Sequence, residues 1–302
     1  MITSGILNIN KEKGITSHDV VERVRRGLRG CKVGHAGTLD PLATGVLVVL
    51  VGQAVRISEY VMDLPKIYRA TITLGASTDT YDSEGAVTST GPIDVTKRRL
   101  EAGLAEFAGD IQQTPPPYSA AKIDGTRAYR LARKGTPIAP KPRTVHVYRL
   151  DLLRFATPNV EIEIECAKGT YIRSIAHDLG VALSCGAHVS KLVRTRVGPF
   201  DVDTALGSTD LPSALQDDVL ESHLRPTDLG LAHLPSLTAG IEDEKDLRHG
   251  QAVEMNDRDL TPTVELSDGL LARGYAEDGR LLGILRFESG TGLWRPHKIF
   301  NQ

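Results

Sequence analysis

The chain has 302 residues with a formal net charge of −2; 40% of the residues are apolar and 25% are charged. Its length predicts one large domain with a smaller one, and its composition is that of a globular enzyme. Three cysteines are too few for a disulfide framework, and no stretch approaches the roughly 18 apolar residues of a membrane helix or the apolar core of a signal peptide. We therefore expect a cytoplasmic protein.

The net charge hides an asymmetry along the chain. Between Lys122 and Arg149 there are eight Lys or Arg residues against one acid, Asp124, whereas residues 201–246 hold eleven acids against two Lys or Arg. A basic segment inside a balanced protein is a candidate phosphate-binding surface, and a solvated loop explains the charge equally well.

The first part of the chain predicts two strands and a helix around a glycine-rich loop. Residues 5–10 (GILNIN) form a short predicted strand, and Ser17 is the expected N-cap of the helix that follows. The loop GHAGTLDPLATG, residues 34–45, then leads into the β-branched run VLVVLVG, which predicts a buried strand.

The next elements alternate between strand and helix. Residues 67–75 (IYRATITLG) carry Tyr68 on their apolar face and predict a half-buried strand. Thr96 is expected to cap a helix that stops at Gly109. A proline-bounded segment of about residues 115–145 follows, and an excursion of this length is usually functional or disordered.

The second half of the chain completes an α+β pattern. TVHVYRLDLL and NVEIEIECAKG predict neighbouring antiparallel strands, and TYIRSIAHDLG has helical spacing. The acidic stretch from about residue 201 to residue 240 is expected to be a connector, and short alternating runs with Asp-Gly and Ser-Gly turns then indicate a small β domain. Long strands without regular βαβ alternation predict the α+β class.

Asp40 is the carboxylate of the glycine-rich loop, and its role has three candidate interpretations. An Asp-Pro turn near glycines is common without function. A phosphate cradle is excluded, because neither GxGxxG nor Gly-Lys-Ser/Thr is present. Zinc could be bound by Cys31 with His35 and Cys185 with His188, but neither pair has CxxC spacing. A simple turn and a zinc site therefore stay open on the residues alone.

Several segments resemble the bacterial tRNA pseudouridine-55 synthase family of the TruB type. GHAGTLDPLATGVL resembles its catalytic motif, and KIYRATITLGASTDTYDSEG resembles its second motif. PPPYSAAKIDGTRAYRLARKG is similar to its tRNA-gripping insertion, and KGTYIRSIAHDLG and CGAHVSKLVRT are similar to its arginine and leucine motifs. The order and spacing of these motifs agree over roughly residues 5 to 200.

The resemblance implies a pseudouridine-synthase fold of the α+β class, with a mixed, mainly antiparallel sheet flanked by helices and loops. The catalytic domain is expected to span residues 1–235, with the basic insertion at about residues 115–145. A small β-rich domain of the PUA type, residues 236–302, is expected to follow on the basis of its position and strand pattern.

The resemblance also implies a reaction without cofactor or metal. Uridine 55 of the T loop is flipped out, its N1–C1′ bond is cleaved, and the turned base is rejoined through C5. Asp40 is the essential carboxylate, which either attacks C1′ or removes a proton from C2′. A glycosidase needs two carboxylates, whereas one suits a base that stays in the pocket. Arg173 matches the arginine that pairs with Asp40, since a buried carboxylate needs such a partner.

Further site residues follow from positions in the family motifs. Tyr68 matches the tyrosine that stacks on the flipped base, although its place on an apolar strand face also suits a core tyrosine. Tyr171 and Leu192 match positions that close the pocket around uracil. His35 matches the histidine that fills the space vacated in the T loop, and Asp82 is expected near the catalytic pair.

Two regions receive weaker predictions. Lys11 belongs to a family motif of Lys-Pro followed by Gly, but the sequence here is KEKG with Glu12 in the proline position, so Lys11 is given only a supporting role. The insertion is expected to bind RNA phosphates through Lys122, Arg127, Arg130, Arg133, Lys134, Lys141 and Arg143.

The implied partner is the T stem-loop of tRNA. The resemblance predicts a monomer that works without a guide RNA, an obligate protein partner or a membrane. Two alternatives stay open, a non-catalytic tRNA-binding or RNA-folding protein and a zinc-dependent base-modifying enzyme.

Overall fold

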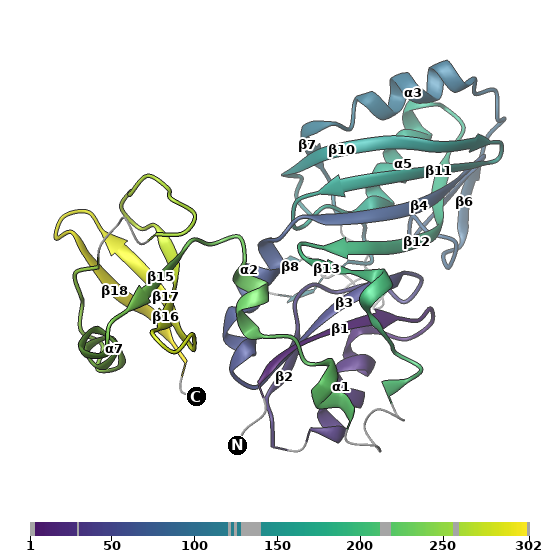
Figure 1. Ribbon diagram of the computed structural model, residues 1–302. Helices are drawn as coiled ribbons and strands as arrows, with labels where there is room; N and C mark the ends of the chain where they lie inside the picture. The colour runs from purple at the N-terminus through teal and green to yellow at the C-terminus, as the bar shows by residue number, and fades with distance from the viewer. Residues whose placement is uncertain are drawn as a thin grey trace.

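The structure is a computed structural model that describes residues 4–28, 30–119, 122–123, 126–127, 140–211, 219–255 and 260–300. It contains one large mixed sheet with helices packed against it and a smaller sheet set to one side (Figure 1).

The large sheet consists of β1 (Gly5–Lys11), β2 (Val33–His35), β3 (Thr44–Val51), β4 (Lys66–Leu74), β7 (Gly109–Gln113), β10 (Arg143–Ala156), β11 (Asn159–Cys166), β12 (Ala187–Val197), β13 (Phe200–Asp201) and β14 (Leu206–Gly207). The smaller sheet consists of β15 (Ser236–Ala239), β16 (Leu271–Ala276), β17 (Leu281–Glu288) and β18 (Leu293–Ile299). Two short hairpins are formed by β5 (Ala76–Thr78) with β6 (Val87–Thr90), and by β8 (Lys122–Ile123) with β9 (Thr126–Arg127).

The α-helices are α1 (Ser17–Gly27), α2 (Ser58–Asp63), α3 (Lys97–Ala105), α5 (Ile172–Ala182) and α7 (Ile241–Arg248). Short 3-10 helices are η1 (Gly52–Ile57), η2 (Val202–Thr204), η3 (Val219–His223) and η4 (Thr227–Leu231).

The strands of the large sheet follow the order β14-β1-β3-β12-β4-β11-β10-β7, with β2 on β3 and β13 on β12. The β1–β14 and β3–β12 pairs are parallel and the other pairs are antiparallel. The expected α+β class and mainly antiparallel sheet are therefore confirmed. β12 joins the two halves of the sheet, because Arg194 faces Gly45 on β3 and Tyr68 on β4.

Helices α3 and α5 pack on one face of this sheet (Figure 1). The alternation predicted for β11 is confirmed, since Ile162 and Ile164 are fully buried and Glu163 is half-buried. Burying one such side chain stabilises the fold by about 1.5–3 kcal/mol, so the alternation fixes which face of the strand joins the main core. Cys166, at the end of β11, belongs to the same core.

Helix α1 begins differently from the prediction. Its N-cap is Thr16, whose Oγ1 accepts a hydrogen bond from the N–H of Asp19 at 3.1 Å, while the Asp19 carboxylate accepts from the Thr16 N–H at 2.7 Å. The expectation that Ser17 is the cap was wrong, because the Ser17 hydroxyl is used elsewhere. Its oxygen accepts from the Leu39 N–H at 2.8 Å, and it donates to the Leu39 carbonyl at 3.1 Å. Ser17 therefore ties α1 to the glycine-rich loop.

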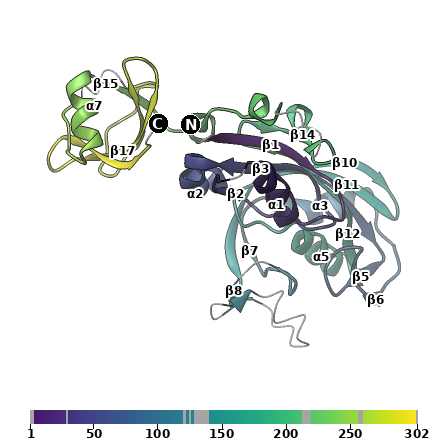
Figure 2. The ribbon, with the colours of Figure 1, turned by 90° about the horizontal axis from the view of Figure 1, so that it is seen from below.

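The smaller sheet has the order β15-β16-β17-β18, and Trp294 is fully buried in its core. It starts at Ser236, and its assignment to the PUA type stays a prediction. Figures 1 and 2 place it on the side of α2, where Lys298 forms an ion pair with Glu59. Within the described residues, no helix is long and apolar enough to cross a membrane.

Candidate active site

The loop between β2 and β3 is fixed at several points along its backbone. The Pro41 carbonyl accepts a hydrogen bond from the Gly14 N–H at 2.9 Å, and the Ala43 N–H closes the turn by donating to the Asp40 carbonyl at 3.0 Å. Together with the contact of Ser17, these bonds tie the loop to the start of α1. The turn therefore holds Asp40 in one defined place.

Arg173, in the first turn of α5, faces Asp40. Its Nε lies 2.9 Å from Oδ2 of Asp40, and the Arg173 side chain is 5% exposed while that of Asp40 is 35% exposed. The other guanidinium nitrogens donate to backbone, Nη1 to the Thr80 carbonyl at 2.9 Å and Nη2 to the Tyr118 carbonyl at 3.0 Å. The two backbone carbonyls thus fix the guanidinium of Arg173. The side chain of Asp40 stays partly exposed.

Asp82 forms a second ion pair with the same guanidinium. Its Oδ2 lies 3.1 Å from Nη1 of Arg173, and its side chain is 6% exposed. Its Oδ1 accepts from the Thr80 hydroxyl at 2.7 Å and from the Glu84 N–H at 3.1 Å. The structure therefore places Asp82 beside the Asp40–Arg173 pair, where it contacts Arg173 without lining the cavity described next.

A cavity of about 630 Å³ opens beside Asp40. This volume lies within the range of small-ligand sites. The walls combine charged groups with aromatic and aliphatic ones, and they contain six of the predicted site residues: Asp40, Tyr68, Arg143, Tyr171, Arg173 and Leu192.

Tyr68 fits both interpretations that its sequence position allows. Its ring packs against the main core and also lines the cavity. Burial raises the pKa of the phenol, and the positive charge of Arg194 acts in the opposite direction. The phenol is therefore uncharged near neutral pH.

Tyr171 is held through its backbone by Gln113. The Tyr171 N–H donates to Oε1 of Gln113 at 2.7 Å, and Nε2 of Gln113 donates to the Tyr171 carbonyl at 3.0 Å. The guanidinium of Arg143 lies 5.1 Å from the centre of the Tyr171 ring, and it also donates to the Gly169 carbonyl. Arg143, which was expected to contact phosphate, thus packs against the cavity wall.

Lys11 is fully buried and reaches the same loop from β1. Its Nζ donates to the carbonyls of Glu12 at 2.8 Å and Ile15 at 2.9 Å, with that of Pro41 at 3.5 Å. Burial lowers the pKa of Lys11 to about 8, although the charge of Asp40 raises it. Lys11 therefore supports the Asp40 loop through its contacts with backbone carbonyls.

Glu12 has contacts that a proline could not make. Its N–H donates to the Ser208 hydroxyl at 3.0 Å, and its carboxylate pairs with Nη1 of Arg23 at 3.0 Å. Arg23 also donates to the Ser208 carbonyl at 3.2 Å. A proline would fix φ but offers no N–H. In this chain the hydrogen bonds from Glu12 and Arg23 to Ser208 hold the backbone that a proline ring would otherwise stiffen.

The remaining predicted residues lie away from the cavity or outside the described residues. His35 ends β2, ahead of the loop, and does not line the cavity. Lys141 is exposed, and only the backbone of Lys122 and Arg127 is described. The predictions for Arg130, Arg133 and Lys134 fall outside the described residues.

Two residues of the site were missed in the sequence. Arg194 is 1% exposed and lines the cavity. It lies two positions after Leu192 on one strand, so strand alternation places both on one face and could have identified it. Gln113 gave no such signal, because it acts through the backbone of Tyr171, 58 positions away.

The zinc interpretation finds no ligand cluster in the part of the chain that the structure describes. No three His, Cys, Asp or Glu side chains are grouped there in a way that could hold a metal ion. Cys185 is buried and Cys31 is half-buried.

The large sheet and the arginine-paired aspartate beside a cavity define a pseudouridine-synthase fold. The solved "Crystal Structure of a Cbf5-Nop10-Gar1 Complex" contains a similar chain, with a TM-score of 0.72 and 27% sequence identity. The similarity covers 95% of this chain and 79% of that chain.

The chain belongs to the TruB family of pseudouridylate synthases. The family model "TruB family pseudouridylate synthase (N terminal domain)" matches residues 25–172, and "tRNA pseudouridylate synthase B C-terminal domain" matches residues 173–232. A "tRNA pseudouridine synthase B" of Dehalococcoides mccartyi is 41% identical over 98% of this chain and 96% of its own length. One of Stutzerimonas stutzeri is 40% identical over 93% and 90%.

The two family segments meet between Ile172 and Arg173, inside the cavity wall. The second segment also supplies β12, which lies in the middle of the large sheet. The site therefore needs both segments, because Asp40 comes from the first and its arginine partner from the second.

Proposed function

We propose that this chain is a tRNA pseudouridine synthase that isomerises uridine 55 in the T loop of tRNA. The observation that carries the proposal is Asp40, ion-paired with Arg173 and lining one cavity with Tyr68. The relatives named tRNA pseudouridine synthase B support tRNA as the substrate. Uridine 55 is inferred from the resemblance of the motifs.

The reaction only rearranges bonds. The N1–C1′ bond breaks and a C5–C1′ bond forms, while C5 loses a proton and N1 gains one, so that substrate and product have the same composition. Asp40 acts at the ribose, by attack on C1′ or by removal of a proton from C2′. Two other acids line the cavity, but both lie on α2 and pair with lysines, Glu59 with Lys298 and Asp63 with Lys168.

The uridine must leave its folded loop to reach Asp40. Extruding a base costs a few kcal/mol, and one stack on an aromatic ring returns about 1–3 kcal/mol. Tyr68 supplies this ring from β4, which pairs on both sides with β11 and β12 and therefore holds it in place before RNA binds. Tyr171 and Leu192 provide the aromatic and aliphatic walls around the uracil.

The chain carries its own basic segment for RNA. Lys141 is exposed at its end, and further Lys and Arg residues precede it. Phosphate contacts from such a segment position a folded RNA without reading its sequence. We expect a monomer that acts in the cytoplasm without guide RNA or protein partner, unlike an assembly such as the Cbf5-Nop10-Gar1 complex.

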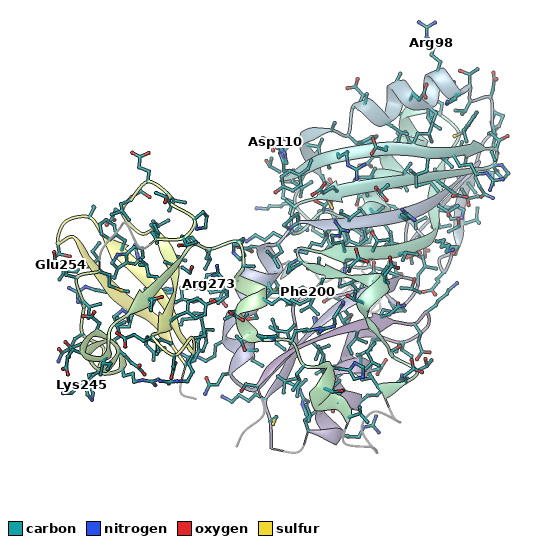
Figure 3. The ribbon with its side chains drawn as sticks, in the orientation of Figure 1. Arg98, Asp110, Phe200, Lys245, Glu254 and Arg273 are labelled. Carbon is teal, nitrogen blue, oxygen red and sulfur yellow. The ribbon has the colours of Figure 1, made fainter. Side chains whose placement is uncertain are left out.

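The test uses T-arm RNA that carries tritium at C5 of uridine 55. Native protein should release the tritium, and sequencing should locate pseudouridine at position 55 alone. Asp40→Asn should bind the same RNA and release no tritium. Asp110→Asn is the matched control, because Asp110 lies at the outer edge of the sheet and is 73% exposed (Figure 3).

Each outcome decides between candidate functions. RNA binding by the native chain without tritium release would indicate a non-catalytic RNA-binding protein. Release that persists in Asp40→Asn would remove Asp40 from the mechanism. Release that stops on treatment with a chelator would revive the zinc-dependent enzyme.

A further inference from the structure

Arg194 is a buried arginine whose contacts differ from those of a typical ion-paired residue. It lies on β12 opposite Gly45 and Tyr68, is 1% exposed, and lines the cavity. A buried arginine is normally paired with a carboxylate. Among the described residues, no ion pair joins Arg194 to an acidic side chain.

The guanidinium of Arg194 binds backbone carbonyls on both sides of Asp40. Nε donates to the Val46 carbonyl at 2.7 Å, and Nη2 donates to the Gly37 carbonyl at 3.0 Å. Nη1 lies 3.5 Å from the Thr38 carbonyl. The planar fork of an arginine can serve several such acceptors at once, which the single ammonium of a lysine cannot do in the same geometry.

The glycines of the loop make this close approach to Arg194 feasible. A Cβ on Gly45 would lie 2.2 Å from the Arg194 carbonyl oxygen, and Gly45 has φ of +98°. Gly37 has φ of +109°, which also favours glycine. Gly45 thus lets the end of the loop approach the backbone of Arg194, and Gly37 presents its carbonyl to the guanidinium.

The charge of Arg194 also acts inside the cavity. It lowers the pKa of Lys66, after the larger effect of burial, and it opposes the effect of burial on Tyr68. The Asp40–Arg173–Asp82 group has two carboxylates and one guanidinium, and so a net negative charge. Arg194 adds a positive charge to the same region, as do Lys11 beside Asp40 and Lys66 in the cavity wall.

We propose that Arg194 is a positioning residue, which fixes the backbone before and after Asp40 so that the carboxylate meets the ribose in the reactive orientation. This inference rests on the proposed function of the cavity. Arg173 holds the carboxylate itself, whereas Arg194 holds the peptide units that carry it. A displacement of about 1 Å at a reacting group can lower a rate about 100-fold.

The experiment compares Arg194→Lys with Arg194→Met in single turnovers with excess enzyme on tritiated T-arm RNA. At saturating enzyme the single-turnover rate constant does not depend on the fraction of enzyme that is folded. Partial misfolding of a variant therefore does not lower the measured rate constant. We expect both variants to lose about 100-fold in rate and to change the RNA dissociation constant less than about threefold. Arg196→Lys, two positions along the same strand, is the matched control, because the Arg196 side chain is 52% exposed and pairs with Asp201.

Two results would overturn the proposal. If Arg194→Lys keeps the native rate, the charge alone suffices and the fork does not position Asp40. If both variants lose RNA affinity and keep the rate of the bound complex, Arg194 serves binding instead. If the native chain itself releases no tritium, the proposed function fails, and that outcome is distinguishable because it precedes any comparison of variants.

Discussion

Replacing Asp82 with asparagine tests whether the second carboxylate on Arg173 matters for both stability and catalysis. The substitution keeps the size of the side chain and an oxygen that can accept from Thr80 and Glu84. It removes the charge that lies 3.1 Å from Nη1 of Arg173. Arg173 then retains one carboxylate partner, Asp40.

The structure sets the expected size of the effect. The two side chains of the pair are 6% and 5% exposed, and breaking a buried pair typically costs about 3–5 kcal/mol. Because Asp82→Asn keeps its neutral hydrogen bonds and Arg173 keeps Asp40, we expect a smaller loss, about 2 kcal/mol of unfolding free energy. Loosening the guanidinium behind Asp40 should also slow the single-turnover rate about tenfold, which corresponds to about 1.4 kcal/mol.

Urea unfolding and tritium release from T-arm RNA measure these two quantities. Asp79→Asn is the matched control: Asp79 lies three residues earlier in the same turn, and its carboxylate accepts from the Ala86 N–H instead of an arginine. Asp79→Asn should change the rate less than about twofold. Native stability and native rate in Asp82→Asn would refute the reasoning, since a buried charge would then contribute nothing to either.

Three further predictions concern the cavity and its loop. Tyr68→Phe should keep the single-turnover rate within about threefold if the ring acts by stacking, and a larger loss would give the hydroxyl a chemical role. Gly45→Ala places a Cβ 2.2 Å from a backbone oxygen of β12 and should cost about 3 kcal/mol or more in urea titrations. Gly14→Ala, at a similar φ but in open space, should cost about 1 kcal/mol, and equal losses would contradict the packing argument. Above pH 8 the rate should fall as Lys11 loses its proton, because burial lowers its pKa to about 8. Lys11→Arg should move this fall in rate to higher pH. If Lys66→Arg moves the fall instead, the titrating group is Lys66, whose pKa is also lowered to about 8.

The elements that local chemistry dictates were predictable from the sequence. The alternation in β4 and β11 gave their buried faces, and Thr96 caps α3 through the Arg99 N–H as expected. Ser17 was misassigned because the capping-box spacing Thr16-x-x-Asp19 was overlooked, whereas Ser17 has Val20 at the matching position. Local sequence does not show the alternative use of the Ser17 hydroxyl, since its partner Leu39 lies 22 positions away.

The sequence indicated the residues that stand in the family motifs, and gave much less on the residues that support another residue. Asp40, Arg173 and Tyr68 sit in recognisable motifs. Gln113 acts on a backbone 58 positions away, and Arg194 acts on backbone carbonyls about 150 positions away. Such contacts leave no pattern in the partner's residue type, because any residue offers a carbonyl; strand alternation indicates the face on which Arg194 lies but not which carbonyls it binds.

The contacts of Glu12 indicate what the proline of the family motif would have to supply at this position. If the family motif needed only a stiff ring, its replacement by glutamate would leave the Lys11 ammonium without a fixed carbonyl to bind. Here the Glu12 N–H is held by Ser208, and its carboxylate is held by Arg23 from α1, so the carbonyl that accepts from Lys11 is fixed by two partners outside the motif. The requirement is therefore geometric, because any arrangement that fixes the Glu12 carbonyl lets Lys11 reach Pro41 and the Asp40 loop. In this chain Ser208, the residue that follows β14, provides that arrangement.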